Sequence, residues 1–127
     1  MSPLTVFVRT LAKSTAIFLG AGVIFLNPTL DLAGSRAVEP LISALKDTNP
    51  DVREKAAFAL GQLKDKAAVD PLVIAARDSV PDVREQAVFA LGQLRDPRAI
   101  DALTTALKDQ NADVRKNAAF ALGQLAR

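Results

Sequence analysis

The sequence contains no cysteine, histidine, tryptophan or tyrosine, and its six phenylalanines are the only aromatic residues. Without cysteine, the chain can form no disulfide and has no thiolate nucleophile. Without histidine, it lacks the commonest general base and the commonest metal ligand. No serine or threonine has a candidate base beside it, and no phosphate-binding glycine loop is present. These absences argue against an enzyme and against a bound metal or cofactor.

A strong excess of charge of one sign is also missing. The chain has 16 basic and 14 acidic residues, which gives a formal net charge of +2. Arg9, Lys13 and Asp31 precede the region 35–127, so this region carries 14 basic and 13 acidic side chains. Domains that bind nucleic acid normally show a basic face or stripe. The near balance of charge therefore gives little support to a nucleic-acid partner.

The chain does contain one segment that occurs three times. Residues 50–63 (PDVREKAAFALGQL) return almost unchanged as 81–94 and again as 112–125, always 31 positions apart. A fixed period of about 20–50 residues is typical of solenoid proteins. We therefore expect three consecutive repeats. Their bounds are 35–65, 66–96 and 97–127.

Each repeat is predicted to form two antiparallel helices. In both halves of the repeat, apolar residues recur at the spacing of one helix face. One such hairpin cannot bury its apolar face alone, whereas three stacked hairpins can. The predicted fold is therefore all-α, an α-solenoid of three 31-residue helical hairpins preceded by an N-terminal hydrophobic helix. The expected core residues are Val38, Leu41, Ile42, Leu45, Val69, Leu72, Val73, Ala76, Ile100, Leu103, Thr104 and Leu107 in the first helices, and Val52, Ala56, Leu60, Leu63 and their counterparts in the second helices.

Residues 1–34 differ in kind from the repeats. Two basic residues precede an uncharged run, residues 15–26, and a small-residue pattern, Ala33-x-Ser35, follows. This order is typical of a secretory signal peptide. A membrane-anchor helix over residues 4–26 is an alternative, and a soluble helix that caps the solenoid is another. The first two imply an exported or membrane-anchored bacterial protein, whereas the soluble cap implies a cytoplasmic one.

A phenylalanine lies on the polar side of each second helix. On a wheel of 100° per residue, Phe58 falls between Glu54 and Gln62, opposite the core-facing residues. Exposed apolar patches tend to mark interaction sites, but each ring could also pack into the groove between adjacent repeats. Both alternatives remain open. The predicted partner-binding residues are Phe58, Phe89, Phe120, Glu54, Glu85, Gln62, Gln93 and Gln124.

The pattern LKD-x-x-PDVRE-x-A-x-FALGQL resembles the HEAT repeat. More narrowly, it is similar to the short bacterial HEAT-like repeats first grouped with phycobilisome lyases, and the resemblance covers residues 35–127. In that family, the aspartate that ends the first helix and the arginine of the second form a hydrogen-bonded ladder between repeats. The resemblance implies this structural role for Asp47, Asp78, Asp109, Arg53, Arg84 and Arg115.

The expected function is that of a scaffold without catalytic activity, whose protein partner lies along the second helices. One alternative is that the repeats form the C-terminal module of a larger bacterial membrane sensor or peptidase. Another is a chromophore-handling protein that resembles the phycobilin lyases, although the missing histidine, cysteine, tryptophan and tyrosine weaken this alternative. No capping unit follows the third repeat in this sequence. Its open end either contacts a partner, which allows oligomerisation, or continues into a longer repeat array of which this sequence is an excerpt.

Overall fold

The computed structural model describes the backbone of residues 16–18, 23–25 and 28–127, and side chains from residue 36 onward. The chain divides into two compact units, Met1–Arg36 and Ala37–Arg127, which we describe separately. In the first unit, β1 (Ala16–Phe18) and β2 (Val23–Phe25) pair antiparallel, with Ile17 opposite Ile24.

The predicted N-terminal hydrophobic helix falls largely outside the described residues, so it stays a prediction. The six described residues of the segment 4–26 are extended. Within the described part of the chain, no helix has both the length and the apolar character needed to span a membrane. Helix α2 (Pro28–Ala44) begins before the expected first repeat, and the boundary predicted at residue 34 lies inside it.

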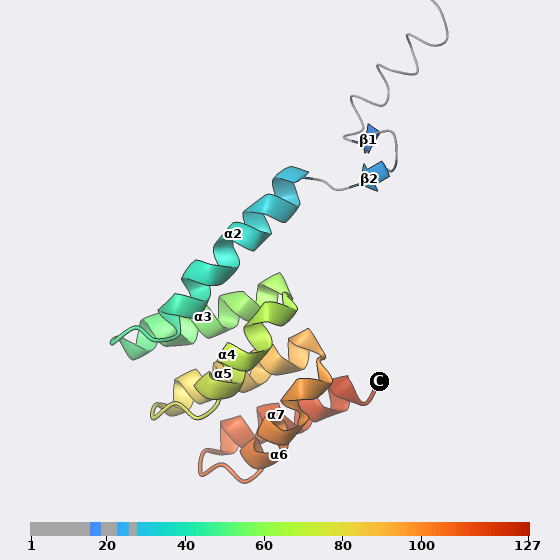
Figure 1. Ribbon diagram of the computed structural model, residues 1–127. Coiled ribbons are helices and arrows are strands. Elements are labelled where there is room, and N and C mark those ends of the chain that lie inside the picture. Colours follow the sequence, from blue (N-terminus) through green and yellow to red (C-terminus); the bar gives the residue numbers. More distant parts are fainter. Residues whose placement is uncertain (1–15, 19–22, 26–27) are drawn as a thin grey trace, which may run out of the picture. The chain divides into compact units, whose positions relative to one another are not determined.

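The second unit is a series of helical hairpins, as predicted. From Ala37 onward, α2 supplies the first helix of the first hairpin, and two further hairpins follow (Figure 1). In these two, a turn of 3₁₀ helix precedes a first helix of only seven residues. The elements are α3 (Pro50–Leu63), η1 (Lys66–Ala68), α4 (Val69–Ala75), α5 (Pro81–Leu94), η2 (Pro97–Ala99), α6 (Ile100–Ala106) and α7 (Ala112–Leu125).

Local capping fixes where the second helices begin. Proline occupies the first position of α3 and α5, where the missing N–H costs little. The Asn49 carboxamide oxygen accepts a hydrogen bond from the Asp51 N–H at 2.8 Å, and Asn111 caps α7 in the same way. Val80 has no side-chain acceptor, and α5 begins without such a cap.

The hairpins stack in sequence order and share one core. Helix α5 packs between α3 and α7, while α4 and α6 cover their own partners α5 and α7 (Figure 1). The largest fully buried side chains include Leu60, Leu72, Leu91 and Leu103, one from each of four successive helices. Burial of such a side chain contributes about 2 kcal/mol, so stacking between hairpins stabilises the fold more than helix propensity does.

Several residues expected in the core are partly exposed. Val52 is 39% exposed, whereas Val83 and Val114, at the same position of α5 and α7, are fully buried. The reason is that α5 and α7 each follow another second helix in the stack, while α3 has none before it within residues 37–127. Other expected core residues with substantial exposure are Leu63, Ile100, Thr104 and Leu107.

Candidate partner-binding surface

The three predicted phenylalanines lie at the same position of α3, α5 and α7, but they differ in exposure. Phe58 is 44% exposed and Phe120 is 54% exposed, whereas Phe89 is half-buried. The Phe89 ring stacks on the Phe120 ring, with 6.4 Å between centroids and 16° between planes. Phe89 therefore packs between repeats, whereas Phe58 and Phe120 expose apolar surface to solvent, and contact with a partner stays a prediction.

The predicted glutamate and glutamine neighbours also connect the repeats. The Gln124 side-chain oxygen accepts a hydrogen bond from the Arg95 guanidinium at 2.8 Å. The Asn117 amide group donates to the Glu85 backbone oxygen at 3.4 Å. Glu54 is half-buried and Gln62 is exposed. We call the eight predicted residues the second-helix surface: Phe58, Phe89, Phe120, Glu54, Glu85, Gln62, Gln93 and Gln124.

Glu85 lies in an unfavourable environment for a negative charge. Burial raises the pKa of the Glu85 carboxyl, and the nearby carboxylates of Asp113, Asp82 and Glu54 raise it further, against a weak hydrogen bond from Asn117. A raised carboxyl pKa means that the folded state loses stability as the pH rises through that pKa. The charge of Glu85 therefore weakens the fold at neutral pH.

We expect Glu85→Gln to raise the melting temperature at pH 7, because the amide removes the partly buried charge and keeps the shape of the side chain. The gain should be about 0.5 kcal/mol, since solvent screens a partly exposed charge. Thermal unfolding at pH 7 and at pH 4 measures it, and the gain should shrink at the lower pH. Glu54→Gln, at the same position of α3, is the matched control. A lower melting temperature for Glu85→Gln at pH 7 would contradict this account.

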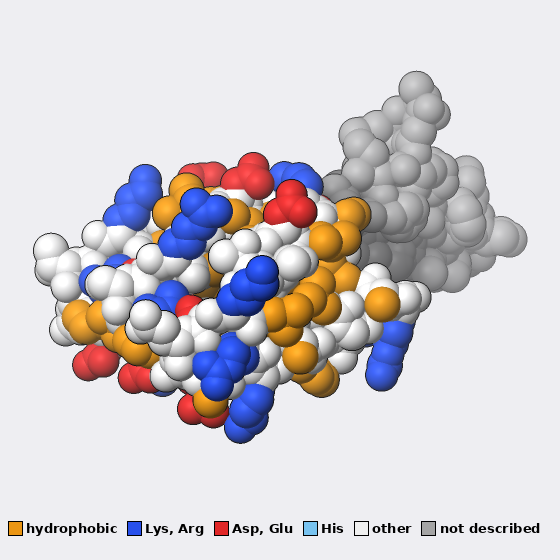
Figure 2. All heavy atoms as spheres, turned by 90° about the horizontal axis from the view of Figure 1, so that it is seen from below, with side chains coloured by type: hydrophobic (Ala, Val, Ile, Leu, Met, Phe, Trp, Pro, Cys, Tyr) orange, Lys and Arg blue, Asp and Glu red, His pale blue; other side chains and the backbone are white. Residues whose placement is uncertain are grey.

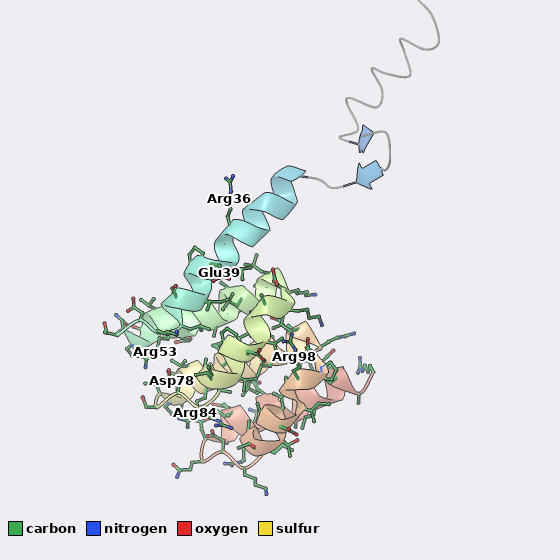
Figure 3. The ribbon with its side chains drawn as sticks, in the orientation of Figure 1. Arg36, Glu39, Arg53, Asp78, Arg84 and Arg98 are labelled. Carbon is green, nitrogen blue, oxygen red and sulfur yellow. The ribbon has the colours of Figure 1, made fainter. Side chains whose placement is uncertain are left out.

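Four of the predicted arginines and aspartates form two ion pairs between neighbouring repeats. Figure 3 labels Arg53 and Asp78, which make one of the two pairs. Arg53 donates from Nε and Nη2 to both carboxylate oxygens of Asp78, at 2.8 and 3.0 Å. Arg84 binds Asp109 in the same way, at 2.9 and 3.0 Å. These side chains are only 12–16% exposed. Planar two-point contacts of this kind are the strong form of a carboxylate–guanidinium pair.

Each ladder arginine also binds the turn that precedes its own helix. Nη1 of Arg84 donates to the backbone oxygens of Asp78 and Ser79, at 2.8 and 3.3 Å. The Arg84 guanidinium therefore forms hydrogen bonds with the turn of its own repeat and an ion pair with the aspartate of the next repeat. Arg53 and Arg115 make the same backbone contacts with residues 47–48 and 109–110.

The two ends of the ladder are unlike its middle. Within residues 37–127, no carboxylate lies within ion-pair distance of Arg115, and no cation lies within ion-pair distance of the Asp47 carboxylate. The Asp47 side chain instead accepts a hydrogen bond from the Asn49 N–H. Of the six predicted ladder residues, the structure brings four together as pairs.

The ion pairs keep their aspartates ionised. A hydrogen bond from Arg84 holds the pKa of Asp109 below its usual range, although burial opposes it. For Asp78, burial acts to raise the pKa, but hydrogen bonds from Arg53 and the Val80 N–H outweigh it, so this pKa is also lowered. Depressed carboxyl pKa values indicate that these side chains stabilise the folded state at neutral pH.

The structure also reveals surface features that the sequence reasoning missed. An open cleft of about 670 Å³ lies at the C-terminal ends of the second helices, lined by Lys64, Lys66 and Arg95 beside the Phe89–Phe120 pair. On the other side of the repeats, Ile74 is 72% exposed. The signal for the cleft was present, because a basic residue directly follows both 50–63 and 81–94.

The described side chains do not form a cluster that would ligate a metal ion. Among them, no group of three or more histidine, cysteine, aspartate or glutamate residues is arranged to hold a metal ion. Asp65 and Asp96 cap the 3₁₀ turns, and Asp96 also pairs with Arg98, whose hydrogen bonds lower the pKa of Asp96 to about 2. These carboxylates are held by structural contacts.

Apolar surface is also visible at the α6–α7 end of the stack. Figure 2 looks at the molecule from below Figure 1 and shows hydrophobic side chains beside lysine and arginine side chains at this end. The exposed large hydrophobic residues of the third repeat are Ile100, Leu107 and Phe120. Phe120 therefore belongs both to the second-helix surface and to the repeat whose outer side has no further hairpin within residues 37–127.

Comparisons with solved structures find the same architecture in proteins of different activities. Human deoxyhypusine hydroxylase in complex with glycerol is 28% identical, with a TM-score of 0.67 over 70% of this chain and 32% of that chain. The complex of CpcE and CpcF of phycocyanin lyase from Nostoc sp. is 29% identical, with a TM-score of 0.64 over 85% of this chain and 40% of that chain.

A designed armadillo repeat protein in complex with the peptide (KR)4 is 24% identical, with a TM-score of 0.63 over 76% of this chain and 49% of that chain, and it shows the fold alone. The chain spans less than half the length of each of these proteins. A search among curated proteins finds no match. The family profile of HEAT repeats matches residues 38–123. With its three-fold sequence repeat, its stacked hairpins and this profile match, the chain belongs to the HEAT-repeat family.

Proposed function

We propose that this chain is a non-enzymatic scaffold that binds a protein partner along its second-helix surface. The observation that carries the proposal is the exposure of Phe58 and Phe120 on helices whose opposite sides already fill the core. A half-exposed phenylalanine contributes little to the free energy of folding, because much of its ring remains in water. Burial of the same ring in an interface removes a large apolar area from water. Helical-repeat folds generally mediate protein interactions, which supports the same function.

The polar neighbours suit an interface rim. Gln62 and Gln124 follow Phe58 and Phe120 by four residues, about one helical turn. Gln62 and the amide nitrogen of Gln124 can form hydrogen bonds with a partner's backbone, while the Gln124 oxygen accepts from Arg95. Exposed aromatic groups surrounded by such polar side chains resemble the anchor-and-rim arrangement of protein interfaces. We place the partner across α3, α5 and α7, with the rings of Phe58 and Phe120 as its main apolar contacts.

We expect Phe58→Ala and Phe120→Ala each to weaken partner binding at least fivefold, an effect of about 1 kcal/mol, and to change the melting temperature little. The partner is first identified by crosslinking to the full chain in its own cells, and its affinity is then measured by calorimetry. Phe89→Ala should lower both affinity and stability, because its ring is half-buried against Phe120.

Ile74→Ala is the matched control, since Ile74 is a more exposed apolar residue that lies outside the second-helix surface. Its removal should leave affinity unchanged. If Ile74→Ala weakens binding and the two phenylalanine variants do not, the partner binds the first helices and the proposed surface is wrong.

A second candidate function is tetrapyrrole handling, which the similarity to the phycocyanin lyase complex favours. The cleft beside Phe89 and Phe120 has aromatic and basic side chains, which suit a planar ligand with carboxylates. The test is to mix the protein with phycocyanobilin and record the absorbance spectrum. A spectral shift that saturates at one equivalent would support this candidate, and an unchanged spectrum would exclude it.

A further inference from the structure

The C-terminal ends of α3 and α5 form a cleft whose charged side chains are all basic. Lys64, Lys66 and Arg95 line it, and the stacked rings of Phe89 and Phe120 form its apolar wall. No acidic residue lies among the lining residues. We call this site the basic cleft.

The basic side chains of the cleft form few polar contacts within residues 37–127. The Lys66 ammonium donates to the Leu94 backbone oxygen, and Arg95 donates from one terminal nitrogen to Gln124. Lys64 is exposed, and within residues 37–127 its ammonium has no ion-pair partner. The helix dipole favours basic residues at the C-terminus of any helix. It does not explain why two aromatic rings lie beside these basic residues.

The backbone at two of these residues is left-handed. Lys64 and Arg95 have left-handed conformations, with φ of 55° and 52°, and they are the only residues other than glycine with positive φ in the described part of the chain. Glycine adopts this conformation without steric cost, whereas a side chain with a Cβ is strained there. Lys64 and Arg95 are the C-caps of α3 and α5, and a left-handed residue is a common way for a helix to end.

The opposite ends of the same helices carry the opposite charge. Asp51, Asp82 and Asp113 lie in the first turns of α3, α5 and α7. Asp113 is paired with Lys116 at 3.2 Å, so Asp51 and Asp82 form an acidic row at one end of α3 and α5. The basic cleft lies at the other end, with the phenylalanines in between. This arrangement orients a bound partner. Acidic residues of the partner are repelled by the acidic row and attracted by the basic cleft.

We propose that the basic cleft binds an acidic segment of the protein partner, whose carboxylates contact Lys64 and Arg95 while an apolar side chain packs on the Phe89–Phe120 pair. This inference rests on the proposed scaffold function and adds the chemistry of the partner. Nucleic acid fits the surface less well, since the acidic row repels phosphates. The cleft thus selects for a partner in which acidic and apolar residues alternate.

The test uses the full chain and two labelled peptides, one alternating glutamate with leucine and one alternating lysine with leucine. Fluorescence anisotropy should show binding of the acidic peptide and much weaker binding of the basic one. Added salt should weaken the acidic complex, because exposed charges are screened at distances of about 10 Å in 0.1 M salt. A single-stranded oligonucleotide is the third probe.

Lys64→Gly is the decisive variant, because it should weaken binding of the acidic peptide without lowering the stability of the fold. Glycine relieves the left-handed strain, so the melting temperature should stay equal or rise. Affinity for the acidic peptide should fall about three- to fivefold, and at least tenfold when Arg95→Gly is added. Lys108→Gln, at an exposed lysine outside the cleft, should change neither property.

The outcomes separate this inference from the scaffold proposal. Equal affinity for both peptides, no loss of acidic-peptide binding in the double variant, or tighter binding of the oligonucleotide would overturn the acidic-segment inference. If the native partner still depends on Phe58, which does not line the cleft, the scaffold proposal survives that result. Binding of the acidic peptide through Lys64, together with a native partner insensitive to Phe58 and Phe120, would instead overturn the scaffold surface.

Discussion

Replacing Gly92 with alanine is expected to lower the free energy of unfolding by about 1–2 kcal/mol, although alanine is the better helix former. An alanine Cβ at this position would lie 2.8 Å from the Cβ and 2.9 Å from the Cα of Ala121. Carbon atoms in contact are normally about 3.5–4.0 Å apart, so α5 and α7 would have to separate. The close approach of these two helices therefore depends on glycine.

Gly123→Ala is the matched control for this prediction. Gly123 lies at the same position of α7, but apart from its chain neighbours and the backbone of its own helix, no described heavy atom lies within 4 Å of a Cβ built there. Alanine should therefore stabilise α7 by about 0.5–1 kcal/mol through its helix propensity alone. The two variants differ only in position, and urea unfolding measures both. Equal effects of the two substitutions would show that the helices do not pack as closely as the structure indicates.

Breaking the ladder at Asp109 is expected to cost about 1–2 kcal/mol, because asparagine loses the negative charge and one of the two oxygens that accept hydrogen bonds from Arg84. Asp109→Asn keeps the shape of the side chain, so the loss reports on charge and hydrogen bonding. Asp47→Asn is the control, since the Asp47 carboxylate has no cation within ion-pair distance in residues 37–127. Urea unfolding at pH 7 should show a large loss for Asp109→Asn and a small one for Asp47→Asn.

The pH dependence gives the ladder prediction a second check. The pKa of Asp109 is lower in the folded state than its usual value of 3.8. A depressed carboxyl pKa contributes stability that is present above the unfolded pKa and is lost as the pH falls through the folded value. The difference between the natural protein and Asp109→Asn should therefore be constant near neutral pH and shrink in acid below about pH 4. A difference that persists unchanged at pH 2 would argue against an ion pair.

The glycine and ladder predictions concern the same interface, which repeats along the stack. Gly61 and Gly92 allow adjacent second helices to approach, and Arg53 and Arg84 bridge adjacent turns. Because neighbouring contacts of this kind are shared, a double variant such as Gly92→Ala with Asp109→Asn should lose less stability than the sum of the two single losses. Such a result would show that neighbouring repeats are energetically coupled.

The candidate site was only partly predictable from the sequence. The helical wheel placed Phe58 and Phe120 away from the core, and they are exposed. It placed Phe89 identically, but this ring is half-buried because the Phe120 ring of the next repeat stacks on it. A wheel describes one helix and contains nothing about the neighbour, so it cannot distinguish a middle repeat from an outer one.

The sequence by itself determined the repeat length, the order of helices and the sequential stack, because a 31-residue period and the spacing of apolar residues are local properties of the chain. Only the tertiary structure decided that Arg84 reaches the aspartate of the next repeat while its third nitrogen binds its own turn. It also decided that Lys64, Lys66 and Arg95 converge beside two aromatic rings. Such contacts depend on the distance and rotation between stacked hairpins, and these are fixed by packing across all the repeats together.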